Sequence, residues 1–419
     1  MIASQRQDWS RVLLRTSLEQ LLRLWRSRAV RVSLGVFIAL RVVTLLVAFV
    51  MVRDMNAARP DILHFNWLTF EGNPSGITYY ASLPVESHLA DLMSPWRRYD
   101  TAWYILIAMQ GYYPDTRIVF PPLYPTLIRL VELFCGGNFV LASVIVSNGF
   151  CVVAFFLLYK LIQREWGDKI ATRTLILLAA FPTGFYLIAG YTEPLFLTFT
   201  LGAFLAAFDR RWLLAGGLAF FASLTRLQGV ALCLPLAWIA YVQYRESGKP
   251  ALLSRIPVLI GAPLGTLTFV LYIAYNNLGS MENAYALGWK MASQMPWESV
   301  LSYIERLQLG IAAAHENNNA FVLGLMAILG VVVLLRFQRT YALYVWSTLA
   351  IILLRYHFGE GMEGAQFESA IRYVLLLFPC FAAAALILRR RWIFALCVVI
   401  MVAMQFYLLN DFVHWVWVA

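Results

Sequence analysis

The sequence predicts an all-α protein whose helices cross a membrane many times. Hydrophobic residues make up 61 % of the 419 residues, and charged residues only 13 %. A soluble domain carries about 25 % charged residues, so a chain this apolar needs a bilayer as solvent for much of its surface. Eleven apolar segments approach the length of about 20 residues that crosses the hydrocarbon core as a helix. They are 33–52, 139–162, 171–190, 194–208, 212–226, 229–244, 256–275, 320–336, 341–356, 371–388 and 392–409.

Basic residues gather in every second loop between these segments. With the N-terminus inside, the inner loops are 160–173, 209–211, 245–255, 336–339 and 389–391, and each of them is basic. Acidic residues collect instead in 53–138, an outer loop in this arrangement. Lys and Arg favour the cytoplasmic side of a membrane protein, so the alternation predicts a cytoplasmic N-terminus and about eleven spans. The net charge of +10 then reflects membrane topology, and nucleic acid is not expected as a partner.

The expected organisation is a single transmembrane domain, 33–419, behind an Arg-rich amphipathic segment, 1–32, on the cytoplasmic membrane face. It has two large outer loops, 53–138 and 276–319. The five Cys lie in or beside apolar runs without paired spacing, so neither a disulfide framework nor a zinc site is expected.

The loop 53–138 is too long to be a simple connector. Within it, aromatic and apolar residues recur at helical spacing over 100–113, which predicts a helix at the membrane surface. Prolines in 120–125 exclude a regular helix there, and 118–138 is expected to be a surface or partly inserted helix that does not cross.

Asp100 is the strongest candidate for chemistry. It stands among aromatic residues in Trp96-Arg97-Arg98-Tyr99-Asp100-Thr101-Ala102-Trp103-Tyr104. Burial among aromatics raises the pKa of a carboxylate, and neighbouring arginines lower it. Such a balance leaves Asp100 ionised and basic enough to take a proton from a hydroxyl. A helix cap is the alternative role, and the two roles are compatible.

Three further charged residues fall at outer turns on the same side as Asp100. Glu193 follows Tyr191-Thr192, and Arg226 and Arg372 are suited to bind a phosphate through paired donors. The alternatives are a solvated turn residue for Glu193 and membrane-interface anchors for the arginines. His315, His357, Glu360 and Glu363 also lie in outer loops, but their spacing does not indicate a metal site; a divalent cation there stays an alternative, and no other cofactor is expected.

The residues 96–104, with Ile107-Ala108, Gly111-Tyr112 and Pro122-Leu123-Tyr124-Pro125, resemble the first-loop signature of the PIG-V-like mannosyltransferases. This family comprises GPI mannosyltransferase II and its bacterial relatives, of the GT-C architecture. Later motifs of the family are similar to Phe181-Pro182-Thr183, Tyr191-Thr192-Glu193, Thr225-Arg226 and Arg372-Tyr373 with Phe378-Pro379, in the same order. The resemblance covers 94–235 well and 368–385 loosely.

The resemblance implies a membrane glycosyltransferase that moves a sugar, mannose in this family, from a polyprenyl-phosphate donor to a hydroxyl with inversion, outside the cytoplasm. It implies Asp100 as the catalytic base, while the acceptor that carries the hydroxyl stays unknown. The candidate substrate-binding residues are Arg97, Arg98, Trp103, Tyr104, Tyr124, Glu193, Arg226 and Arg372. Arg98, Arg226 and Arg372, in that order, are expected to bind the leaving phosphate.

The sequence departs from the family pattern at two places. Pro121 replaces a second Phe before Pro-Leu-Tyr-Pro, and Leu227-Gln228 replaces Pro and a small residue after Thr-Arg. Both departures touch the expected donor side of the site.

Two other functions fit a polytopic protein. A secondary transporter or flippase needs ionisable residues within its spans. Arg41 lies inside the first segment, whereas Arg355 stands near a segment end, where it is expected to snorkel to the interface. A structural scaffold, the second alternative, does not explain the cluster of acid, aromatic and Arg residues around Asp100.

Overall fold

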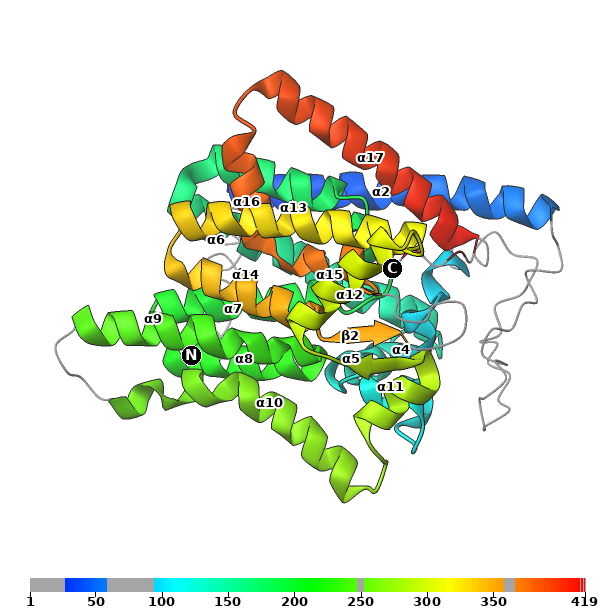
Figure 1. Ribbon diagram of the computed structural model, residues 1–419, viewed down its shortest axis with the longest axis horizontal. Helices are drawn as coiled ribbons and strands as arrows, with labels where there is room; N and C mark the ends of the chain where they lie inside the picture. The colour runs from blue at the N-terminus through cyan, green and yellow to red at the C-terminus, as the bar shows by residue number, and fades with distance from the viewer. Residues whose placement is uncertain are drawn as a thin grey trace, which may run out of the picture.

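The computed structural model is nearly all-helical, which confirms the predicted fold class (Figure 1). It describes residues 27–58, 94–246, 252–357, 366–414, 416 and 418. Most of the expected segment 1–32 and much of the loop 53–138 therefore lie outside the described residues. Within the described part, two short strands, β1 (Met291–Ser293) and β2 (Arg355–His357), pair antiparallel, with Ser293 opposite Arg355.

The apolar segments of the sequence form the longer helices of the bundle. These are α2 (Arg28–Ala58), α6 (Phe139–Ala180), α7 (Glu193–Phe208), α8 (Trp212–Thr225), α9 (Cys233–Glu246), α10 (Ile256–Tyr275), α13 (Ala314–Arg336), α14 (Arg339–Ile352), α16 (Phe378–Ile387) and α17 (Arg391–Val413). Shorter α-helices are α4 (Asp100–Gln110), α5 (Leu123–Glu132), α11 (Met281–Trp289), α12 (Pro296–Gln308) and α15 (Ala370–Tyr373). The 3-10 helices are η3 (Ser94–Arg97), η4 (Thr116–Val119), η5 (Gly184–Leu187), η6 (Leu227–Leu232), η7 (Leu252–Arg255) and η8 (Val374–Leu376).

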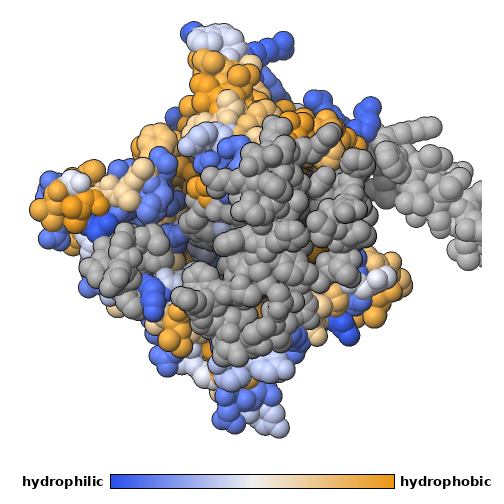
Figure 2. Space-filling view, turned by 90° about the vertical axis from the view of Figure 1, so that its right-hand side faces the viewer, coloured by the Kyte–Doolittle hydropathy of each residue, from blue (hydrophilic) through white to orange (hydrophobic). Residues whose placement is uncertain are grey.

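Six helices of the described part are long and apolar enough to cross a membrane. The number is seven if the pair 370–376 and 378–387, bent by 81°, forms one broken span, and α7 and α8 are apolar but shorter. The count of eleven spans therefore stays a prediction. Many large apolar side chains on these helices are exposed, as at Leu46, Leu271 and Leu335. Figure 2 shows hydrophobic patches on several outward parts of one face, with hydrophilic residues beside them. An integral membrane protein accounts for this surface, because lipid tails cover what water would not.

Two expected helices are interrupted. The predicted segment 171–190 stops being helical after Ala180, because Pro182 disfavours helical backbone at Phe181. The segment 371–388 bends by 81° just before Phe378-Pro379, where proline removes a backbone donor. In α6 the break falls at Gly167, whose φ of 79° suits glycine. This break lies inside 160–173, the basic loop expected between two spans.

The expected inner loops contact one another at one end of the bundle. Arg164 Nη1 donates a hydrogen bond to Asp209 Oδ1 at 2.7 Å, and Gln338 Nε2 donates to Glu165 Oε2 at 2.9 Å. At the other end lie α4, α5, α11 and β2, on the right of Figure 1. The alternation of loop charge thus corresponds to two separate ends of the molecule.

Helix α4 is covered by protein along most of its length. Eight of its residues are buried: Asp100, Thr101, Ala102, Tyr104, Ile105, Leu106, Ile107 and Ala108. This differs from the membrane-surface position that the spacing predicts. The physical reason is that α4 itself carries apolar residues on all of its sides, which is typical of a helix in a protein core.

Candidate active site

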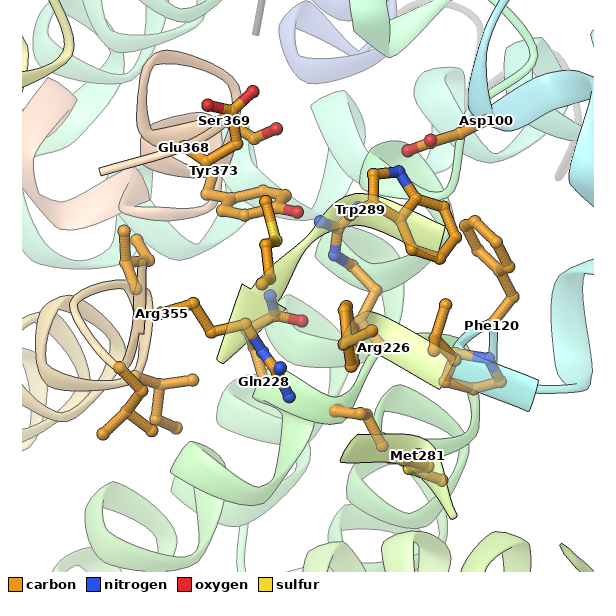
Figure 3. A pocket seen from close by; sticks show the side chains of 18 of the residues that line it. Asp100, Phe120, Arg226, Gln228, Met281, Trp289, Arg355, Glu368, Ser369 and Tyr373 are labelled. Atoms are coloured by element: carbon orange, nitrogen blue, oxygen red, sulfur yellow. The ribbon is translucent and has the colours of Figure 1, made fainter. Parts of the chain in front are cut away.

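A cavity of about 440 Å³ lies at the end of the bundle that holds α4, α11 and the paired strands (Figure 3). Its wall carries both charged and apolar side chains. The charged side chains are Asp100, Arg226, Arg355, Glu368 and Arg372. Apolar side chains come from η6, α10, α14 and the link from α14 to β2: Leu227, Val230, Val270, Ile351, Ile352 and Leu354. The cavity can therefore hold a ligand that has both charged and apolar parts.

Asp100 enters this cavity from the first position of α4. Its Oδ2 accepts a hydrogen bond from Arg372 Nη1 at 2.7 Å, and both side chains are largely buried. The N-cap position itself belongs to Tyr99, which makes no side-chain capping bond. The carboxylate of Asp100 is thus held by a cation from the far end of the chain, while the residue still faces the cavity.

Glu193 connects Arg372 to a second arginine. The fully buried Glu193 begins α7, and its Oε1 accepts from Arg226 Nη1 at 2.7 Å and lies 3.4 Å from Arg372 Nε. Arg226 Nη1 also donates to Thr192 Oγ1 at 2.7 Å. Asp100, Glu193, Arg226 and Arg372 thus form a chain of ion pairs, called here the ion cluster. Two acids and two arginines make it formally neutral, which offsets the cost of burying the charges.

Aromatic side chains support the start of α4. The Tyr104 hydroxyl lies 3.4 Å from Thr192 Oγ1, and its ring meets Tyr124 edge-on at 5.0 Å. Tyr124 donates from its hydroxyl to the Ser143 carbonyl at 2.9 Å, and Trp103 stacks on Phe120 at 6.2 Å. Burial, and secondarily the charge of Asp100, raise the pKa of Tyr104, so its hydroxyl keeps its proton. These contacts fix the helix that carries Asp100.

The backbone next to Arg372 is held from both sides. Asn319 Oδ1 accepts from the Ile371 N–H at 2.9 Å, and Thr183 Oγ1 donates to the Ile371 carbonyl at 2.7 Å. Both side chains are buried. Thr183 belongs to the Phe181-Pro182-Thr183 motif, so this motif has a structural role in placing Arg372.

Only some of the residues predicted for the site line the cavity. Asp100, Tyr104, Arg226 and Arg372 line it, and Glu193 lies directly behind them in the ion cluster. Trp103 and Tyr124 do not line it but pack behind its wall. Arg98, the first candidate for the phosphate, is not part of the lining either, because its side chain is buried in the protein. Arg97 ends η3, and its side chain lies outside the described part.

Several residues of the cavity carry no motif in the sequence. Tyr285 and Trp289 on α11 line it, as do Arg355 on β2 and the two departures from the family pattern, Pro121 and Gln228. Arg355 does not simply snorkel at a span end, since its guanidinium lies 3.5 Å over the Tyr285 ring. Burial raises the pKa of Tyr285 to about 12, so the ring beneath Arg355 is neutral at physiological pH. No spacing pattern marked Tyr285, Trp289 or Arg355 as site residues, because α11 and the strands come together only in the fold. Pro121 and Leu227-Gln228 stood out in the sequence only as departures from the family pattern.

The described residues contain no group of three or more His, Cys, Asp or Glu side chains placed to hold a metal ion. Of the residues weighed for a cation, Glu360 and Glu363 lie outside the described part, as does the side chain of His357.

Comparison with known proteins gives one significant similarity. The chain is 27 % identical over 147 residues to GPI mannosyltransferase 2 of Schizosaccharomyces pombe, which covers 34 % of this chain and 32 % of that protein. The chain thus matches about a third of the length of this curated relative. No family model matches the chain, and no solved structure does. The similarity, together with the apolar helices, indicates a mannosyltransferase-like family of membrane proteins.

Proposed function

We propose that the protein is a membrane glycosyltransferase that moves a sugar, expected to be mannose, from a polyprenyl-phosphate donor to an acceptor hydroxyl. The observation that carries this proposal is the placement of Asp100. A carboxylate faces a cavity that is lined by both arginines and aliphatic side chains. The similarity to a mannosyltransferase supports the same class of reaction.

In the proposed reaction, Asp100 takes the proton of the acceptor hydroxyl. The acceptor oxygen forms a bond to the anomeric carbon, and the bond from that carbon to the phosphate oxygen breaks. Its electron pair leaves with the polyprenyl phosphate, and attack opposite the leaving group inverts the anomeric centre. Arg372 holds Oδ2 of Asp100, which fixes the direction of the carboxylate toward the cavity. Arginines in the wall offset the charge that develops on the phosphate.

The apolar part of the wall supports a lipid-linked donor. Val230, Val270 and Ile351 come from three different elements, η6, α10 and α14, and face the same cavity. When the phosphate of a polyprenyl donor enters the cavity, the methylene groups nearest to it leave the membrane as well. They then need an apolar surface beside the phosphate site.

We place the site on the extracytoplasmic side. The support is the charge of the loops, since the end opposite the cavity carries the basic loops 160–173, 209–211 and 336–339. Labelling of the variants Lys290→Cys and Arg210→Cys with a membrane-impermeant thiol reagent tests this placement. A reagent added on the extracytoplasmic side is expected to label Lys290→Cys and not Arg210→Cys.

The function is tested by incubating the purified protein with polyprenyl phosphates that carry radiolabelled mannose, glucose or arabinose, together with membrane lipids from the native host. The expected result is release of the labelled sugar from its carrier into a new product, with mannose preferred. Transfer of a different sugar would overturn the mannose assignment. Movement of an intact donor across sealed vesicles without any covalent change would favour a flippase instead.

A further inference from the structure

Among the described residues, three arginines line the cavity, and two of them belong to the ion cluster. Arg226 and Arg372 are both bound to Glu193, and Arg372 also to Asp100, at 2.7 to 3.4 Å. Their charges are thus already offset by buried carboxylates. A phosphate that approached them would have to compete with acids that cannot move into water.

Arg355 is placed differently. Among the described residues, it forms an ion pair with Glu282, whose Oε2 lies 3.9 Å from Arg355 Nη1, beyond hydrogen-bond distance. The side chain of Glu282 is 52 % exposed, so solvent weakens this ion pair. Glu282 is bound more closely to Ser293, whose N–H and Oγ donate to it at 3.1 and 3.0 Å. The Nη1 of Arg355 is buried and makes no hydrogen bond within the described part.

The scaffold around Arg355 keeps the guanidinium at the cavity. Arg355 lies on β2 and pairs with Ser293 on β1, and its guanidinium stacks on Tyr285. In Figure 3, Arg355 and Asp100 lie on opposite sides of the cavity. Three apolar residues that shortly precede Arg355 in the chain, at the end of α14 and in its link to β2, also line the cavity: Ile351, Ile352 and Leu354. An anion bound by Arg355 would therefore have aliphatic surface beside it and the carboxylate across from it.

We infer that Arg355 is the residue that binds the phosphate of the lipid-linked donor, with Tyr285 as its support. The ligand class is a phosphate ester on a long apolar chain. This inference rests on the proposed function, because it assigns one end of the same substrate. Arg355 thus binds the phosphate in place of Arg98, Arg226 and Arg372, the three arginines expected from the sequence. The ion cluster then serves to orient Asp100.

The experiment measures binding of three probes to the full-length protein in detergent: geranylgeranyl phosphate, geranylgeraniol and inorganic phosphate. Arg355→Ala is expected to weaken binding of geranylgeranyl phosphate at least about tenfold, since a charge-assisted hydrogen bond is lost. Arg355→Lys should retain part of the affinity, and Glu282→Gln should increase it, because it removes the competing acid. Arg336→Ala, an exposed arginine at the end of α13, is the matched control and should bind as the wild type does.

Binding of geranylgeraniol should be equal in wild type and Arg355→Ala, which also shows that the variant is folded. Wild-type affinity for geranylgeranyl phosphate in Arg355→Ala would overturn the inference and leave the proposed donor class intact. A wild-type protein that binds no prenyl phosphate would overturn the donor class together with the inference. Inorganic phosphate that binds as tightly as the prenyl phosphate would assign the site to free phosphate and overturn the lipid-linked ligand.

Discussion

Arg372 Nη1 donates to Asp100 Oδ2 at 2.7 Å, although the two residues are 272 positions apart in the chain. The pair joins α4, which begins at Asp100, to the bent helix pair near the C-terminus. Glu193 and Arg226 extend it from two further turns. Four short segments that lie far apart in the sequence are therefore parts of one ion cluster.

Asp100→Asn should lower sugar transfer by at least about 100-fold, because a general base contributes a factor of this size. Transfer is measured with labelled polyprenyl-phosphate mannose. Asp115→Asn is the matched control: Asp115 also pairs with an arginine, Arg117, at 2.6 Å, but it does not line the cavity. Comparable activity in the two variants would remove Asp100 from the role of base.

Glu193→Gln should destabilise the protein by about 3–5 kcal/mol, because it leaves two buried arginines without their shared acid. Unfolding in detergent measures the change. Glu193→Gln combined with Arg226→Gln should cost less than the sum of the single variants, as expected for residues in contact. By contrast, Arg164→Gln breaks a pair whose side chains are 47 % and 50 % exposed, and should cost less than about 1 kcal/mol. Equal losses of stability in Glu193→Gln and Arg164→Gln would contradict a stabilising role for the ion cluster.

Asn319→Ala should reduce stability by about 1–3 kcal/mol and also reduce transfer, since it leaves the buried Ile371 N–H without its acceptor beside Arg372. The neighbouring Asn318 is exposed, so Asn318→Ala supplies a control with the same chemical change. Activity and unfolding temperature are compared for the pair. An Asn319→Ala variant that matches Asn318→Ala in both would show that this hydrogen bond does not position Arg372.

Gly216→Ala should destabilise the bundle by about 1–3 kcal/mol, the usual cost of overpacking. A Cβ at Gly216 would overlap the carbonyl of Pro257, where α8 and α10 are in close contact. Gly217 is the control, because a Cβ there meets nothing within 4 Å. Gly217→Ala should be neutral or slightly stabilising, since Ala favours a helix. Thermal unfolding of both variants checks this, and a reversed order would mean that the two helices are not packed through Gly216.

The sequence was informative about those features of the fold that depend on a single segment of the chain. Apolar length predicted the long helices, and the basic loops predicted which turns lie together, because hydrophobicity and charge act locally. Glu193, Arg226 and Arg372, which the charge pattern placed on the same side as Asp100, lie with it in one ion cluster.

What remained unpredicted depends on contacts between distant segments. The apolar residues on all sides of α4 are compatible with a core, but only the packing of distant segments shows that α4 is buried there. Arg98 and Arg355 are both arginines beside apolar residues, and only tertiary packing buries one and turns the other into the cavity. Likewise, α11 and the β1–β2 pair carry no periodic pattern long enough to be recognised before the fold is known.

The formal neutrality of the ion cluster has a consequence for the timing of the proposed reaction. When Asp100 accepts the acceptor proton, it loses its negative charge, and the cluster acquires a net charge of +1. That change occurs as the sugar leaves and the phosphate gains negative charge across the same cavity. The protein then attracts the departing group most strongly at the moment of bond cleavage, and it returns to neutrality when the proton is released.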